Sequence, residues 1–156
     1  MDGHNFEKLK KHILDLSSAK EFATACKEWE LDSVELSEEW DNCPCGQDIK
    51  EHCYIKNIIN GKTTYVGNKC IKRFMDRNED NLFEGLRRIK TDEKANANQA
   101  VIDYAFQRGF IHDDKEYKFL VETKNKRKLS EPQLRWKIKI NRRILNKTVV
   151  HKRTIR

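Results

Sequence analysis

The sequence lacks the long apolar stretches that membrane insertion or export would need. It holds no run of about 18 or more apolar residues, so no segment is expected to cross a bilayer. Residues 1–16, MDGHNFEKLKKHILDL, have no apolar core of the kind found in signal peptides, so we do not expect export. We therefore expect a cytoplasmic protein with reduced cysteines. The high Lys, Asn and Ile content is typical of an AT-rich genome such as a phage's, which would place the protein in the host cytoplasm.

The sequence also lacks the motifs of common enzyme classes. It contains no Gly-rich loop for a phosphate and no recognisable nucleophile motif. His112, Asp113 and Asp114 carry the donor atoms of a hard-cation site. Acidic residues are common at helix starts, however, so we interpret these residues as helix caps. The missing motifs favour a binding function over catalysis.

Charged residues are abundant but unevenly distributed. The chain carries a net charge of +7, yet residues 1–52 hold six basic and 13 acidic residues. Residues 120–156 hold 13 basic and two acidic residues. Such a basic segment favours a polyanion such as nucleic acid as the partner. The acidic N-terminal half would suit a basic protein partner, which is the alternative.

The chain is predicted to adopt an α+β fold, mainly α, in three parts. Residues 1–41 are expected to form an acidic helical hairpin. Its first helix has an apolar face made of Phe6, Leu9, Ile13 and Leu16. A capping box, Ser18–Glu21, is expected to open the second helix. The apolar face of that helix would consist of Phe22, Cys26 and Trp29, which makes Cys26 a core residue. The segment ELDSVELSEEW then leads to the cysteines as a strand.

The second part, residues 42–76, is expected to be a β-hairpin followed by a helix. The segments YIKNII and KTTYVG flank Asn60-Gly61, a dipeptide typical of tight hairpin turns. Gly67 and Asn68 end the second strand. The segment KCIKRFM then starts a helix with Cys70 in its first turn.

The third part, residues 77–156, is expected to be helical and basic. NLFEGLRRIK is amphipathic, NANQAVIDYAFQRGF predicts a helix that ends at Gly109, and DDKEYKFLVETK predicts another. A capping box, Ser130–Gln133, with Pro132 in the first turn predicts a last helix over EPQLRWKIKINRRILN. The alternation in RWKIKI is the competing strand signal.

Four of the five cysteines are predicted to bind one structural zinc ion. Cys43 and Cys45, in CPCG, resemble a zinc knuckle, although one residue separates them where two are usual. Cys70 is the third predicted ligand, because the hairpin returns the chain to the knuckle and a helix N-terminus favours a thiolate. His52 and Cys53 are neighbours on a strand, so only one of them can face the metal. We favour Cys53 as the fourth ligand, and His52 is the alternative.

The order of knuckle, hairpin and helix-start cysteine resembles a treble-clef zinc finger over about residues 40–76. It is similar to zinc-finger segments of small phage and bacterial proteins. The resemblance implies a metal-bound fold unit and no single task, because this class includes nucleic-acid-binding, protein-binding and nuclease proteins.

The leading hypothesis is a non-catalytic zinc-finger protein that binds nucleic acid, DNA in particular, as a phage-type regulator. The predicted phosphate-binding residues are Lys69, Lys72, Arg73, Arg77, Lys126, Arg127, Lys128, Arg135, Lys139, Arg142 and Arg143. Of these, Lys69, Arg73 and Arg77 are spaced four residues apart and are expected to line one exposed face of the helix that holds Cys70. The alternative is an adaptor or inhibitor that binds a host protein of transcription, replication or defence. A zinc-scaffolded nuclease is the third hypothesis.

Overall fold

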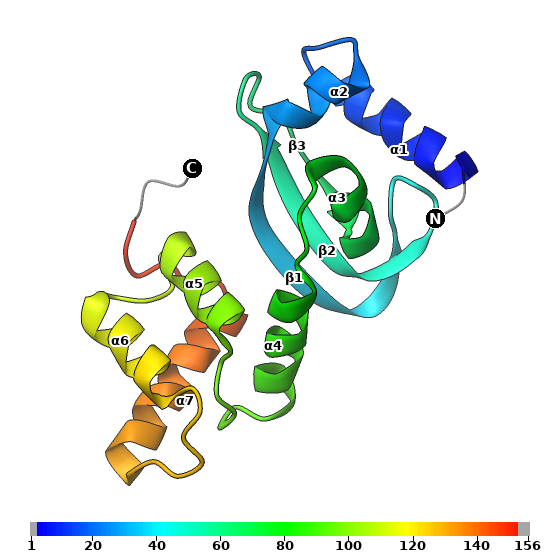
Figure 1. Ribbon diagram of the computed structural model, residues 1–156. Helices are drawn as coiled ribbons and strands as arrows, with labels where there is room; N and C mark the ends of the chain where they lie inside the picture. Colours follow the sequence, from blue (N-terminus) through cyan, green and yellow to red (C-terminus); the bar gives the residue numbers. More distant parts are fainter. Residues whose placement is uncertain (1–2, 153–156) are drawn as a thin grey trace. The chain divides into compact units, whose positions relative to one another are not determined.

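The computed structural model describes residues 3–152 and divides the chain into two compact units, Met1–Glu79 and Asp80–Arg156 (Figure 1). Residues 1–2 and 153–156, which belong to the first and third predicted parts, lie outside the described residues. Helices predominate over a three-stranded antiparallel sheet, which confirms the predicted α+β class, mainly α. None of the helices within residues 3–152 has the length and apolar composition that crossing a membrane requires.

The first unit combines a small sheet with short helices. Its elements are α1 (Gly3–Leu16), α2 (Phe22–Ala25), the 3-10 helix η1 (Cys26–Glu28), β1 (Trp29–Asn42), β2 (Asp48–Asn57), β3 (Thr63–Gly67) and α3 (Asn68–Met75). The strand order is β1-β2-β3, and both pairs are antiparallel. The predicted hairpin is confirmed, with Lys56 paired with Thr63 and a φ of 76° at Gly61 in the turn. The turn is longer than the predicted Asn60-Gly61 turn, because β2 ends at Asn57 and β3 begins at Thr63, so Ile58 and Ile59 belong to the turn. The sheet therefore joins the end of the first predicted part to the second.

The second N-terminal helix is shorter than predicted. α2 has only four residues, its N-cap is Glu21, and Trp29 is already the first residue of β1. Cys26 lies half-buried in η1, so it is not the core residue that we expected, and Ala25 is buried instead. Trp29 adopts the strand conformation because pairing in β1 buries its side chain against the sheet. This burial outweighs the helical spacing of Trp29 from Phe22 and Cys26.

Helices cover one face of the sheet. α3 packs against β2 and β3, and Figure 1 shows it lying over the sheet. α1 is joined to β3 by a hydrogen bond of 2.8 Å between His12 Nε2 and Thr64 Oγ1. The fully buried side chains of this unit include Leu9, Ile13, Cys53, Ile55, Val66 and Ile71. The core of this unit is therefore small and ends at the cysteines.

The second unit is a helical bundle of α4 (Asp80–Thr91), α5 (Gln99–Arg108), α6 (Asp114–Thr123) and α7 (Glu131–Leu145). The caps are those that the sequence predicts. Gly109 ends α5 in the left-handed region, and the Asp113 carboxylate accepts the Glu116 N–H at the start of α6. Ser130 and Gln133 form the reciprocal capping box of α7, so the strand alternative for RWKIKI is wrong.

A buried ion pair lies at the centre of the second unit. Arg143 donates to the Glu116 carboxylate and to the Phe110 carbonyl, both at 2.7 Å. The same carboxylate accepts the His112 N–H at 2.7 Å and the Trp136 ring N–H at 2.9 Å. Burial alone would raise the pKa of Glu116, but these hydrogen bonds outweigh it and hold the pKa below its usual value. The ionised pair thus connects α6 to α7.

Glu116→Gln is expected to destabilise the second unit by about 3–5 kcal/mol at pH 7, because it leaves the buried Arg143 without its ionic partner. The lowered pKa means that the carboxylate stabilises the fold above its unfolded pKa, near 4.5, and that this stabilisation is lost as the pH falls through the folded-state value. Urea denaturation of both proteins at pH 7 and pH 3 measures the effect. The exposed Glu131→Gln serves as control, with an expected loss below about 1 kcal/mol. An equal loss of unfolding free energy in the two variants would contradict the stabilising role of the buried Glu116–Arg143 ion pair.

Candidate metal centre

Three thiols converge between the β1–β2 loop and the start of α3. The Sγ atoms of Cys43, Cys45 and Cys70 all lie within 4.8 Å of one another. All three residues are buried, with exposed fractions of 2 % or less. Within the described part of the chain, this is the group of His, Cys, Asp and Glu side chains whose donor atoms lie close enough to hold a metal ion.

A tight turn brings the first two thiols together despite their short spacing. The Gly46 N–H donates to the Cys43 carbonyl at 2.7 Å, and the Cys43 N–H donates to the Gln47 carbonyl at 2.8 Å. Gly46 has a φ of 98°, a conformation that side-chain-bearing residues rarely adopt. The glycine of CPCG therefore closes the knuckle, and Pro44 restricts the backbone within it.

Hydrogen bonds to sulfur favour a thiolate at Cys43. Cys43 Sγ and Cys70 Sγ lie 3.5 Å apart in a hydrogen bond, and the Gly67 N–H donates to Cys43 Sγ at 3.3 Å. With a further bond from the Cys45 N–H, they lower the pKa of Cys43 to about 6. The same Cys43–Cys70 bond, together with burial, raises the pKa of Cys70, and burial raises that of Cys45. Of the three thiols, Cys43 therefore loses its proton at the lowest pH, because hydrogen bonds stabilise its thiolate.

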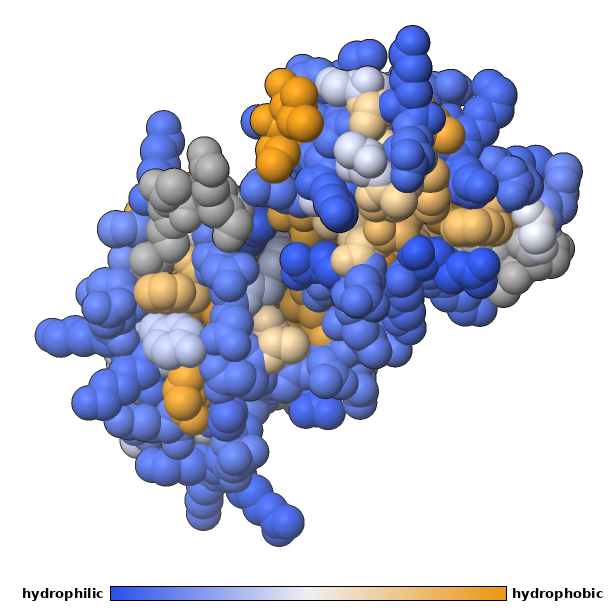
Figure 2. Space-filling view, turned by 45° about the horizontal axis from the view of Figure 1, so that its top comes forward, coloured by the Kyte–Doolittle hydropathy of each residue, from blue (hydrophilic) through white to orange (hydrophobic). Residues whose placement is uncertain are grey.

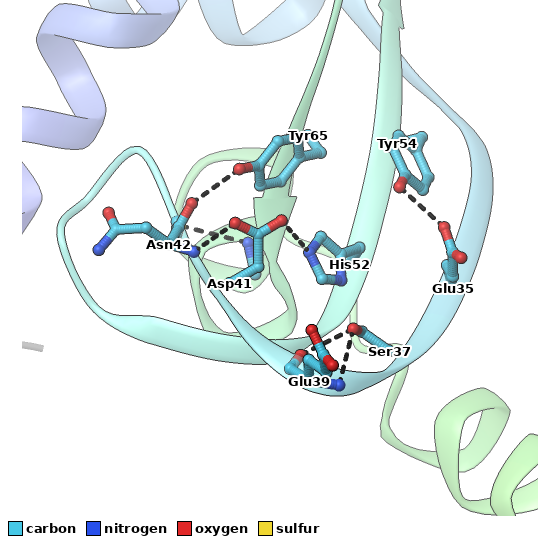
Figure 3. Close-up of polar contacts among 10 residues, drawn as sticks. Glu35, Ser37, Glu39, Asp41, Asn42, His52, Tyr54 and Tyr65 are labelled. Carbon is cyan, nitrogen blue, oxygen red and sulfur yellow. Dashed lines mark hydrogen bonds and ion pairs between the residues drawn. The ribbon is translucent and has the colours of Figure 1, made fainter.

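A polar network on the other face of the sheet anchors the chain just before the knuckle (Figure 3). The Asp41 carboxylate accepts the Asn42 N–H at 2.7 Å and lies 3.1 Å from His52 Nε2. Both contacts lower the pKa of Asp41. The Tyr65 hydroxyl donates to the Asn42 carbonyl at 2.8 Å. Because Asn42 directly precedes Cys43, the network sets the position of the first thiol relative to β2 and β3.

The structure brings together three of the four predicted cysteines. Cys53 is fully buried on the helix-covered face, burial raises its pKa, and it lies outside the group of mutually close sulfurs. His52 points to the opposite face, where its Nε2 faces Asp41 and its Nδ1 is buried without a hydrogen-bond partner among the described residues. The predicted opposition of these two neighbours on the strand is therefore observed, and the choice of the fourth ligand stays a prediction.

The start of α1 lies against the knuckle, which the sequence does not reveal. A Cβ atom built on Gly46 would lie 3.2 Å from Lys8 Nζ and 3.7 Å from Asn5 Oδ1. These residues are about 40 positions away in sequence and belong to no motif with the cysteines. Only the tertiary fold brings them to the site.

The predicted basic face on the Cys70 helix is only partly helical. α3 ends at Met75, and Asp76 is left-handed, so Arg77 lies beyond the helix. Arg77 Nε lies 2.7 Å from Glu79, and the Arg73 guanidinium lies over the Phe6 ring at 4.7 Å. Lys69 is exposed and Lys72 is half-buried. The predicted basic stripe of Lys69, Arg73 and Arg77 along one helix is therefore wrong, because the helix ends two residues before Arg77.

The basic residues of α7 fall into two groups. Arg142 makes a two-bond contact with Glu93 at 2.9 and 3.1 Å, and Arg143 is buried against Glu116. Arg135 and Lys139 are exposed. All four line a groove of about 590 Å³ together with Ile138, Asn146 and Thr148. The loop residues Lys126, Arg127 and Lys128 are also exposed.

Comparisons of the chain with protein-family models, curated proteins and solved structures found no match. The resemblance to a treble-clef zinc finger therefore rests on the residues of this chain alone. The geometry shows that the buried cluster of Cys43, Cys45 and Cys70 could hold a metal ion.

Gly67→Ala is expected to reduce the free energy of unfolding of the first unit by about 1–3 kcal/mol, the usual cost of overpacking. The new Cβ would lie 2.8 Å from Ile49 Cγ2 and would disturb the N–H donor to Cys43. Gly3→Ala is the matched control, because its Cβ meets nothing within 4 Å. Chemical denaturation of the two variants measures the difference, and an undiminished stability of Gly67→Ala would show that the strand end is not tightly packed.

Proposed function

We propose that this is a non-catalytic zinc protein that binds nucleic acid, DNA in particular, through its C-terminal unit. The observation that carries the nucleic-acid part is the groove along α7, whose lining includes the cations of Arg135 and Lys139. The metal part rests on the buried group of Cys43, Cys45 and Cys70.

Zinc is the metal that the donor set fits best. Thiolates are soft ligands that select zinc over magnesium or calcium, whose ligands are oxygen atoms. In this proposal Cys53, which lies fully buried on the helix-covered face, supplies the fourth thiolate and closes the site. Four protein ligands leave no position for a substrate, so the ion would hold the knuckle to α3 and act structurally. A unit with so small a core gains much of its folding free energy from such an ion.

Protein purified without added metal is expected to contain about one zinc ion per chain, as a single four-ligand site requires. Cys70→Ser should abolish zinc binding, and Cys26→Ser should leave it intact, because Cys26 is half-buried away from the group. Elemental analysis measures zinc, and the absorption of a cobalt-substituted sample reports the number of thiolate ligands. A metal-free, folded wild-type protein would refute the proposal.

The same measurements separate the two candidates for the fourth ligand. Cys53→Ser should lose zinc and His52→Ala should keep it if the thiol is the ligand. The opposite pattern would assign the role to His52. Retention in both variants would show that the three converging cysteines bind the ion without either residue.

The charge of the second unit supports a polyanion as partner. Asp80–Arg156 holds 20 basic and 10 acidic residues. Glu93 and Glu116 neutralise Arg142 and Arg143, so these two arginines shape the groove and stabilise the bundle. The other five phosphate-binding residues predicted in this unit are exposed: Lys126, Arg127, Lys128, Lys139 and Arg135, which lies 3.8 Å from the exposed Glu131. Phosphate contacts of this kind position a nucleic acid without reading its sequence.

The double variant Arg135→Glu, Lys139→Glu is expected to weaken binding to duplex DNA and to reduce the slope of log affinity against log salt by about 2, close to one unit for each lost phosphate contact. Lys115→Glu, Lys118→Glu is the control, since it changes the net charge equally at exposed positions on α6. Fluorescence anisotropy at several salt concentrations provides the slopes. Equal losses would indicate a general charge effect, and no binding at low salt would refute the nucleic-acid proposal.

A protein-binding adaptor is the second candidate, and one exposed side chain favours it. Trp40 is 67 % exposed at the end of β1, where Glu38, Glu39 and Asp41 surround it in sequence. Tryptophan is a frequent anchor of protein interfaces. Copurification of Trp40→Ala and wild-type protein after nuclease treatment would show whether a protein partner depends on this side chain.

A further inference from the structure

The turn between β2 and β3 presents two adjacent isoleucines to solvent. Ile58 and Ile59 are 57 % and 65 % exposed. Figure 2 shows a compact hydrophobic patch at the place where Figure 1 has the β2–β3 turn. Single exposed apolar residues are common on protein surfaces, but a pair at the tip of a hairpin is not required by the turn itself.

Side-chain hydrogen bonds hold the backbone of this turn. The Asn57 Oδ1 atom accepts the N–H groups of Ile59 and Asn60 at 2.8 and 3.2 Å. The Asn60 side chain donates to the Leu16 carbonyl at 2.9 Å and accepts the Lys62 N–H at 2.9 Å. The turn is therefore joined to the end of α1 as well as to its own strands.

A buried carboxylate holds the base of the turn. Glu28 and Asn57 are 3 % and 0 % exposed, and Asn57 Nδ2 donates to Glu28 Oε1 at 2.9 Å. Glu28 also accepts the N–H groups of Ser18 and Ala19 at 2.8 and 2.7 Å. The Ile58 N–H donates to the Glu28 carbonyl at 2.7 Å. Buried polar groups thus fix a segment whose apolar side chains do not enter the core.

Cations flank the two isoleucines. Lys56 precedes them and Lys62 follows them, and both residues are exposed. A rigid apolar tip between two lysines matches a duplex, in which stacked bases lie between two phosphate backbones. Isoleucine is among the side chains that architectural proteins insert between base pairs.

We propose that the β2–β3 turn is a wedge that inserts Ile58 and Ile59 between stacked base pairs, with Lys56 and Lys62 at the flanking phosphates. The inference rests on the proposed nucleic-acid binding and adds to it a partner structure, the deformable duplex. Burial of two isoleucines is of the same order as the cost of unstacking one base step. The hydrogen-bonded turn loses little conformational entropy on insertion. The free energy of insertion is most favourable at a flexible base step, where deforming the DNA costs least.

The test uses duplex DNA with a fluorescent base analogue at a flexible pyrimidine–purine step and with a dye pair at its ends. Wild-type protein is expected to raise the fluorescence of the analogue, which reports unstacking, and to shorten the distance between the ends, which reports bending. Ile58→Ala, Ile59→Ala should abolish both signals and weaken binding by about 10-fold or more, while the salt slope stays unchanged.

Val149→Ala is the control variant, because Val149 is also a large exposed apolar residue, with 56 % exposure, and lies in the other unit. Zinc content and circular dichroism confirm that both variants fold. Lys56→Ala, Lys62→Ala should reduce the salt slope by about 2 if both lysines contact phosphates.

The outcomes separate this inference from the proposed function. Salt-dependent binding without unstacking or bending would overturn the wedge and leave nucleic-acid binding standing. Equal unstacking and bending signals from wild-type protein and from Ile58→Ala, Ile59→Ala would also overturn the wedge and leave nucleic-acid binding standing. A loss of self-association in the isoleucine variant, measured by sedimentation, would assign the turn to a contact between two copies instead. Absence of binding at low salt would overturn both proposals.

Discussion

The contact between Cys43 and Cys70 joins the β1–β2 loop to the start of α3 at the edge of a small core. Cys43 follows β1, Cys70 belongs to the first turn of α3, and the Gly67 N–H between them in space donates to the same sulfur. The sheet positions these thiols, and the buried thiols extend the small hydrophobic core of the first unit at one end. The β1–β2 loop, the start of α3 and the buried Cys45 all meet at this convergence.

Much of the fold could be predicted because its signals are local. The Asn-Gly turn specified the β2–β3 hairpin, Ser130 and Gln133 specified the start of α7, and Gly109 specified the end of α5. Trp29 was misplaced on a helix because its spacing from Phe22 and Cys26 fits a helical face. What decides its conformation is pairing with Asn57 in β2, a residue 28 positions later that no local pattern reveals.

Three of the four predicted cysteine ligands of the candidate site were identified from the sequence, whereas the acidic partners of the basic residues were not. CPCG and the helix-start cysteine identified Cys43, Cys45 and Cys70, because a turn and a helix terminus impose their geometry locally. The charges of the C-terminal unit were harder to interpret. Arg142 and Arg143 appeared equivalent to Arg135 in sequence, yet Glu93 and Glu116 engage them from 49 and 27 positions away. A count of basic residues therefore overestimates the cations available to a phosphate, because Arg143 is buried and Arg142 is paired with Glu93.

The short separation of the cysteines has a kinetic consequence. The loop closed between Cys45 and Cys70 contains 24 residues, and the β2–β3 hairpin lies entirely within it. A hairpin forms in about 1–10 μs, and it shortens the effective distance that loop closure must bridge. The thiols of this unit can therefore meet soon after α3 has been synthesised, long before any encounter that requires distant parts of the chain. The order of events during synthesis is thus set by where the cysteines stand along the polypeptide.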